Sequence, residues 1–286
     1  MGNTNFDMDF NPKDEVNSFP EVDLKFLISK EEVWENLLLQ LDEPQMKTKR
    51  VSLISPRYRF AVAASLILLL GLAGFFRLYT RTISSPAGQH LTFYLPDSSL
   101  IELNAQSEIR YHPYWFRFSR TLALDGEAFF KVTSGIRFNV LSKRGETTVL
   151  GTSFNIYSRN NDYSVTCFTG KVRVVSAEKS ERVLLNPDEQ AFINKEGFLR
   201  FVQEINTQTA KSWRDNMFVF TGSSVIDVLQ EIERQYNIKI ILHGNPNLTY
   251  TGNFSKSLSE KEVLNLVCTP LGLKFEPTSN NEFLVD

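Results

Sequence analysis

The sequence contains few of the side chains that build catalytic or metal sites. It has three histidines and two cysteines in 286 residues. It has no HExxH, no cysteine pair at metal-binding spacing, no GxSxG and no phosphate-binding loop. We therefore predict that the protein is not an enzyme and that it holds no metal ion and no cofactor.

Asp125 and Glu127 are the acidic pair closest to a catalytic arrangement. Side chains two residues apart share one face of a strand. However, Gly126 lies between them, and this context favours a hydrogen-bonded turn over the carboxylate pair of a glycosidase. We do not expect catalysis from this pair.

The sequence also lacks an excess of one charge and a framework of cysteines. It has 31 basic and 33 acidic residues, a net charge of -2. The protein therefore lacks the overall positive charge that favours direct binding of nucleic acid. Cys167 and Cys268 fall in different predicted modules, and we expect each to be buried without a disulfide.

Charge is absent altogether from residues 60–76, FAVAASLILLLGLAGFF. As a helix this run is about 25 Å long, and the tyrosine and arginine side chains at both ends can extend it by snorkelling. We predict a transmembrane helix over residues 60–78. The alternatives are a buried core helix, which normally shows a polar face, and a signal peptide, which would not follow 59 residues.

The flanks of this helix predict its orientation. Five basic residues precede it closely, and only two follow it within 20 residues. These are Lys47, Lys49, Arg50, Arg57 and Arg59 before the helix, and Arg77 and Arg81 after it. The positive-inside rule therefore places the N-terminus in the cytoplasm and the C-terminus across the membrane.

The predicted cytoplasmic tail, residues 1–59, contains one amphipathic helix. Ser29 and Glu32 form a capping box, and residues 30–41 carry an apolar stripe. The stripe consists of Val33, Trp34, Leu37, Leu38 and Leu41. Because a tail of this size cannot build a core around a tryptophan, we expect a protein partner to cover the stripe. The alternatives are the bilayer surface and another part of the tail.

After the membrane helix, residues 79–90 have the Ser, Pro and Gly composition of a linker. Residues 91–205 then alternate apolar and polar side chains in short runs separated by turn signals, which predicts an all-β domain. The expected strands are residues 91–95, 99–103, 121–132, 138–142, 147–158, 163–168, 171–176, 182–185, 190–194 and 198–202.

Residues 213–286 predict a small α+β domain in the order β-α-β-β-α-β-β. Its first helix is capped by Ser223 or Ser224, and its second begins at Ser257 or Ser259. We expect both helices to pack on one sheet face through apolar stripes. The stripes are Val225, Val228, Leu229, Ile232 and Tyr236, and Val263, Leu264, Leu266, Val267 and Leu271. We expect residues 282–285 to form an exposed edge strand.

Several motifs in this order resemble those of FecR-type membrane anti-sigma regulators, of the kind found in Bacteroidetes. They are LPDSS (95–99) with IELN (101–104), GEAFFKV (126–132), VLGTSFN (149–155), TGKV (169–172) and LNPDEQA (185–191). The segment from Trp213 to Phe220 and the module after it are similar to the family's C-terminal domain, which is akin to the signalling and secretin N-domain fold. Ser98, Arg137 and Asp188 depart from the residues usual in the family.

The resemblance implies a single-pass protein of the inner membrane with a twisted, solenoid-like β domain in the periplasm. It implies that the tail binds a sigma factor of the extracytoplasmic-function class. It also implies a TonB-dependent outer-membrane transporter as the source of a signal. We expect the closing strand, Glu282, Phe283, Leu284 and Val285, to bind the transporter's signalling domain by strand addition. The alternative function is that of a periplasmic structural or cell-wall-binding protein on a membrane anchor.

Sigma release is expected to require membrane proteases. The glycines and alanines of the membrane helix favour local unwinding and cutting, although they equally suit packing against another helix. An earlier cut is expected in the linker or at Gly151–Thr152, where a hydroxyl follows an unhindered glycine carbonyl that it can attack. The alternative for Gly151 is a β-bulge glycine.

Overall fold

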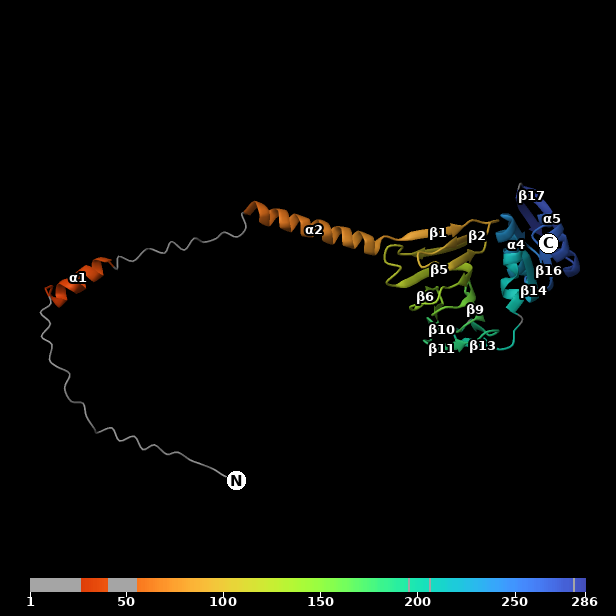
Figure 1. Ribbon diagram of the computed structural model, residues 1–286. Coiled ribbons are helices and arrows are strands. Elements are labelled where there is room, and N and C mark those ends of the chain that lie inside the picture. The colour runs from red at the N-terminus through yellow and green to blue at the C-terminus, as the bar shows by residue number, and fades with distance from the viewer. Residues whose placement is uncertain (1–26, 41–55, 195, 206, 280) are drawn as a thin grey trace, which may run out of the picture. The chain divides into compact units, whose positions relative to one another are not determined.

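The computed structural model describes residues 27–40, 56–194, 196–205, 207–279 and 281–286 (Figure 1). The chain divides between Arg59 and Phe60 into two units. The second unit contains a β domain and a C-terminal α+β domain.

Helix α1 spans Lys30–Gln40 in the first unit. The Glu32 backbone N–H donates to Ser29 Oγ at 3.2 Å, as a capping box requires. The predicted stripe residues Val33, Trp34, Leu37 and Leu38 are all exposed, Leu38 by 64%. The fifth predicted stripe residue, Leu41, lies outside the described residues.

Helix α2 spans Pro56–Leu78. The stretch from Arg57 to Leu78 has a mean hydropathy of 2.1, and no part of it is buried in the protein. At 1.5 Å per residue it is about 33 Å long, which matches the thickness of a bilayer's hydrocarbon core. Within the described part of the chain, this is the one helix long and apolar enough to anchor the protein in a membrane.

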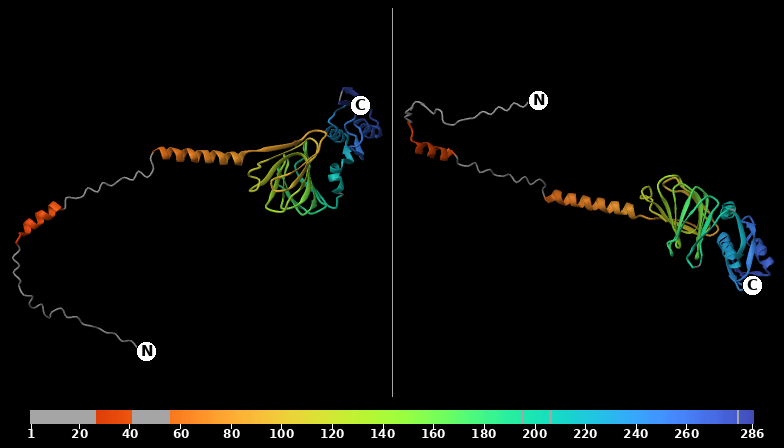
Figure 2. Two further views of the ribbon diagram at one scale, coloured as in Figure 1. Left: turned by 45° about the horizontal axis from the view of Figure 1, so that its top comes forward. Right: turned by 90° about the horizontal axis from the view of Figure 1, so that it is seen from below.

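The β domain consists of thirteen strands in one continuous, strongly curled sheet (Figures 1 and 2). The strands are β1 Arg81–Ser85, β2 Leu91–Tyr94, β3 Leu100–Leu103, β4 Ser107–Tyr111, β5 Arg120–Lys131, β6 Phe138–Leu141, β7 Gly145–Val149, β8 Ser153–Arg159, β9 Asp162–Thr169, β10 Val172–Ser176, β11 Arg182–Leu185, β12 Gln190–Ile193 and β13 Leu199–Val202. The longest path is β11-β10-β7-β6-β5-β8-β9-β12-β13.

Strand β5 joins the two halves of this sheet. Its first half pairs with β4 and β6, and its second half pairs with β3 and β8. Gly126, at the change of partners, has φ +106°, and a Cβ there would lie 2.7 Å from Ser107 Cα. Glycine therefore permits the strand to bend. Inward side chains from both halves, such as Leu103, Phe130 and Phe154, meet in one apolar core.

The structure differs from the predicted β domain in three respects. Residues 81–85, predicted as linker, form β1 and pair with β4, a strand that was not predicted. Asp125 and Glu127 lie inside β5 rather than in a turn. The expected solenoid is instead a nearly closed, barrel-like sheet, in which the described strand pairs of the β domain are antiparallel except for β5–β6.

The C-terminal domain has the predicted order of elements. After α3 Thr207–Lys211 and a 3-10 turn at Ser212–Asp215 come β14 Met217–Ser224, α4 Val225–Tyr236, β15 Lys239–Leu242, β16 Thr249–Ser255, α5 Glu260–Cys268, a 3-10 turn at Thr269–Leu271, β17 Phe275–Ser279 and β18 Glu282–Val285. Ser224 caps α4, and Ser259 forms a complete capping box with Glu262 at α5. The predicted apolar stripes are buried or half-buried, except that Leu266 is exposed.

The pairing of these strands corrects two predictions. The strands form two small sheets, β14-β16 and β15-β18-β17, rather than one. Strand β18 is the centre of its sheet, parallel to β15 and antiparallel to β17, so the prediction of an exposed edge at residues 282–285 is wrong. The closing strand inserts between two earlier ones, and this buries Phe283 and Val285.

Candidate functional site

The outward-facing residues of β3, β5 and β8 form a row that the C-terminal domain covers. Glu102, Phe129 and Asn155 are register partners across these strands. Successive strand residues point to opposite faces, so their neighbours Leu103, Ala128 and Ile156 enter the core of the β domain. Phe129 instead belongs to the apolar cluster of the C-terminal domain. The sheet thus presents a second buried face.

Trp213 and Arg214 attach the C-terminal domain to this row. The buried Trp213 indole donates from Nε1 to Asn155 Oδ1 at 3.4 Å. Arg214 binds Glu102 through two hydrogen bonds of 2.8 and 2.5 Å, and its guanidinium lies 3.8 Å from the centre of the Phe129 ring. A bidentate, stacked arginine fixes both distance and orientation.

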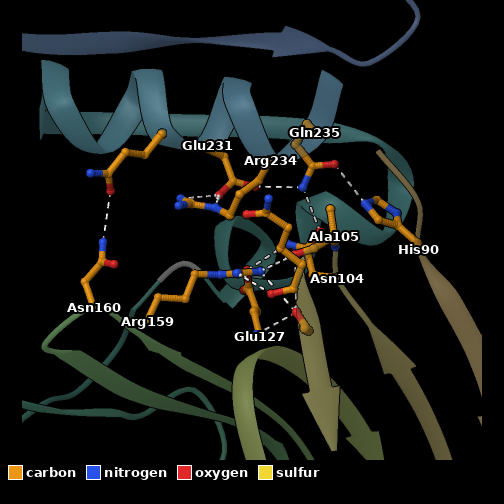
Figure 3. Close-up of polar contacts among 12 residues, drawn as sticks. His90, Asn104, Ala105, Glu127, Arg159, Asn160, Glu231, Arg234 and Gln235 are labelled. Atoms are coloured by element: carbon orange, nitrogen blue, oxygen red, sulfur yellow. Dashed lines mark hydrogen bonds and ion pairs between the residues drawn. The ribbon is translucent and has the colours of Figure 1, made fainter. Parts of the chain in front are cut away.

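Helix α4 extends the contact through a buried polar network (Figure 3). Gln235 donates from Nε2 to Asn104 Oδ1 at 2.7 Å and to Glu231 Oε1 at 2.8 Å. Arg234 donates through Nε and Nη2 to Glu231 Oε2 at 2.9 and 2.8 Å. These three residues lie outside the apolar stripe of α4, and each is at least 90% buried. The helix is therefore enclosed on both sides.

Glu127 is the acidic residue of the network on the side of the β domain. Its Oε2 accepts from Asn104 Nδ2 at 2.8 Å, and its Oε1 accepts from Asn155 Nδ2 at 2.9 Å. Burial raises the pKa of Glu127 above its ordinary value, and the Glu231 carboxylate adds to the rise. The Arg159 charge and the two asparagine amides oppose this rise. Two carboxylates and two guanidiniums thus share one poorly solvated region.

Arg159 holds the turn that carries Asn104. It donates to the backbone carbonyls of Ala105 and Gln106 at 2.6 and 2.8 Å, and to Ser107 Oγ at 3.1 Å. Ser107 Oγ in turn accepts from the Glu127 backbone N–H. The backbone next to Asn104 is therefore held by contacts within the β domain.

The segment between β1 and β2 completes the interface. The Gly88 N–H donates to the Arg234 carbonyl at 2.8 Å, and Lys256 Nζ donates to the Gly88 carbonyl at 2.7 Å. Because Gln235 Oε1 accepts, His90 donates to it from Nε2 at 3.0 Å. Burial lowers the pKa of His90 below its ordinary value, which favours the neutral imidazole.

This arrangement fastens two domains and contains no catalytic geometry. The carboxylate and amide oxygens of the network accept hydrogen bonds, some within one domain and some across the interface. No group of three or more metal-ligating side chains gathers among the described residues. A buried ion pair adds little net stability, but loss of one partner leaves the other charge buried and unpaired at a high cost. The site therefore joins the two domains through directional polar contacts.

The predicted cleavage residues lie away from this network, between β7 and β8. Thr152 is buried, and its hydroxyl donates to the Lys171 carbonyl at 3.1 Å. A Cβ on Gly151 would lie 2.8 Å from Ser134 Cα, so close packing alone requires glycine there. Attack on the Gly151 carbonyl would first require the Thr152 hydroxyl to leave Lys171. Cleavage at this bond stays a prediction.

Several residues of the network belong to the sequence motifs, although the sequence alone indicated no role for them in an interface. Glu102, Glu127 and Asn155 belong to the motifs IELN, GEAFFKV and VLGTSFN, and they occupy outward positions of adjacent strands. The large apolar side chain of Phe129, at an outward position among them, was a usable signal for a second buried face. Trp213 carried the same signal. Arg234 and Gln235 carried none, because charged and amide residues are usual on the outer face of a helix.

The fold and this site define a membrane-anchored protein with two extramembrane domains locked together by a polar interface. Comparison with known proteins gives the family. A FecR protein model matches residues 81–173, and a FecR C-terminal model matches residues 217–285. Together they cover more than half of the chain. None of the curated proteins matches the sequence significantly.

Two crystal structures from Parabacteroides distasonis, each described as a "putative anti-sigma factor", are similar to the chain. Both share 27% sequence identity with it, at TM-scores of 0.65 and 0.66. The match covers 72% of this chain and 98% of theirs. The chain belongs to the FecR family. Members of this family are non-enzymatic regulators, so the protein is not an enzyme.

Proposed function

We propose that the protein is an anti-sigma factor that crosses the inner membrane once and binds a sigma factor of the extracytoplasmic-function class. A TonB-dependent outer-membrane transporter signals its release. Membership of the FecR family and the likeness to the Parabacteroides structures support this proposal. The observation that carries the sigma contact is the exposed apolar stripe of α1, where Val33, Trp34, Leu37 and Leu38 have no cover within the described residues.

The tail alone tests the sigma contact. Residues 1–55, fused to an affinity tag and exposed to lysate of the native bacterium, are expected to retain a sigma factor that mass spectrometry identifies. The control is the same tail with Trp34 and Leu38 both changed to serine. Recovery of no sigma factor, together with tight binding of the full chain to peptidoglycan, would support the alternative of a cell-wall-binding protein.

The orientation is proposed from the basic residues that precede α2. A phosphatase reporter that folds only in the periplasm is expected to be active when fused after Asp286 and inactive when fused near Gln45. A reporter that is fluorescent only in the cytoplasm serves as the control and should give the opposite result. The reverse pattern for both reporters would contradict the proposed orientation.

The transporter contact is proposed for the C-terminal domain, on the edges of its second sheet. The closing strand is central, so strand addition is available at β15 or β17 rather than at Glu282, Phe283, Leu284 and Val285. Site-specific cross-linking from these two strands during induction locates the contact. Deleting residues 217–286 is a poor test, because it would uncover Phe129 and Glu127 on the β domain.

Release by membrane proteases is proposed as the final step. Gly71 and Gly74 lie within α2, and small residues there favour local unwinding. The first cut is not expected in residues 79–90, which were predicted to be a linker, because residues 81–85 of this segment are held in the sheet. An immunoblot of N-terminally tagged protein during induction distinguishes successive fragments from release of the intact chain.

A further inference from the structure

The loop between β4 and β5, residues 112–119 with the sequence HPYWFRFS, carries exposed aromatic rings beside the end of α2. Tyr114, Trp115 and Phe118 are exposed, Phe118 by 70%. Phe116, in the middle of the loop, is fully buried and packs edge-on against Tyr111 and Phe138. One ring thus anchors the loop in the core while its neighbours point outward.

Hydrogen bonds within the loop hold the exposed rings in place. The N–H groups of Phe118 and Ser119 donate to the Trp115 carbonyl at 2.9 and 3.1 Å. The Trp115 and Phe118 rings lie 4.9 Å apart. Because the buried Phe116 and these bonds fix the backbone, the exposed rings cannot turn into the core. Soluble proteins rarely expose such a cluster without a partner.

The loop contacts the last turn of α2 directly. The Phe76 and Tyr114 rings meet edge to face at 4.9 Å, and the Arg77 guanidinium lies 4.6 Å from the centre of the Trp115 ring. His112 Nδ1 is 3.1 Å from the Tyr79 carbonyl oxygen. The loop is therefore level with the point where the uncharged run of the helix ends.

That level is where a bilayer changes from hydrocarbon to head groups. The uncharged run of about 25 Å is slightly shorter than a hydrocarbon core of about 30 Å, so lipid must reach the residues next to Phe76. Tryptophan and tyrosine favour this boundary because one end of the ring system is apolar and the other is polar.

We propose that residues 112–119 are a membrane-docking loop, with Tyr114, Trp115 and Phe118 inserted into the lipid–water boundary of the leaflet where α2 emerges. The occupant of this surface is lipid, because the surface is continuous with the membrane helix. Docking fixes the β domain against the bilayer, a role beyond sigma binding and independent of it.

An environment-sensitive fluorophore on the loop tests the proposal. In the full chain, Phe118→Cys is labelled with a nitrobenzoxadiazole dye, and the protein is reconstituted into phosphatidylethanolamine–phosphatidylglycerol nanodiscs. The native thiols, Cys167 and Cys268, are buried, and burial raises the pKa of each to about 11, so they label poorly. The matched control is Phe201→Cys, an exposed aromatic position on β13. Tyr114→Cys provides a second loop position.

We expect blue-shifted emission from both loop positions and strong quenching when the discs contain nitroxide-labelled lipid, with neither effect at residue 201. Emission typical of water and no quenching at both loop positions would overturn the proposal. A blue shift without quenching by lipid would also overturn it, since the rings would then be covered by protein.

Discussion

Replacing Glu231 with alanine is expected to lower the free energy of unfolding of the extramembrane part by about 3–5 kcal/mol. The Glu231 and Arg234 side chains are only 11% and 9% exposed. Loss of the carboxylate therefore leaves a guanidinium buried without its ion-pair partner, and it also removes an acceptor of Gln235. Thermal unfolding of residues 80–286 should show a melting temperature lower by about 10 °C.

A double variant separates the ion pair from simple loss of packing. Glu231→Ala with Arg234→Ala is expected to be more stable than Glu231→Ala alone, because no buried charge is left unpaired. The control is Glu276→Ala, the same change at an exposed position in the same domain. The proposed interface would be contradicted if Glu231→Ala melted within 1 °C of the wild type.

Truncating Trp34 to alanine is expected to weaken sigma binding by about 2 kcal/mol or more, roughly thirtyfold in affinity. The indole is 55% exposed on α1, and a tryptophan at the centre of an interface often supplies much of its binding energy. Titration of the purified sigma factor against tail peptides, by calorimetry or fluorescence anisotropy, measures the change.

Leu39→Ala is the matched control for this titration. Leu39 is on the same helix and is 77% exposed, but it lies outside the predicted stripe. Its truncation is expected to change the affinity less than threefold. Equal losses for Trp34 and Leu39 would mean that helix stability, rather than the stripe, determines binding. An unchanged affinity for Trp34→Ala would reject the stripe as the sigma contact.

The elements that the sequence predicted correctly are those in which one side-chain pattern dominates. The uncharged run of α2 indicates apolar surroundings, and the apolar stripes of α4 and α5 indicate which face of each helix is buried. Most strands of the β domain alternate clearly, because one face is core and the other is solvent. Even Ser98 and Asp188, which depart from the family, keep the left-handed backbone of the turns, with φ of 65° and 64°.

The predictions were incomplete or wrong where the burial of a residue depends on a partner distant in the sequence. Strand β1 carries Ile83 as its one large apolar residue, and its hydrogen bonds with β4, rather than its side chains, place it in the sheet. The position of β18 in its sheet depends on which strands it pairs with, and the local sequence pattern does not indicate these partners. Similarly, the buried state of Glu127 depends on Arg159 and Asn104, whose arrangement only the folded chain provides.

Strand β1 has a mechanical consequence for the connection between membrane and interface. It begins three residues after α2 and ends three residues before Gly88, which is bonded to α4. Extended backbone is already near its maximum length of about 3.3 Å per residue, so it cannot lengthen under load as a slack linker would. A force that displaces α4 is therefore transmitted to the last turn of the membrane helix, because the strand between them cannot absorb the displacement by extending.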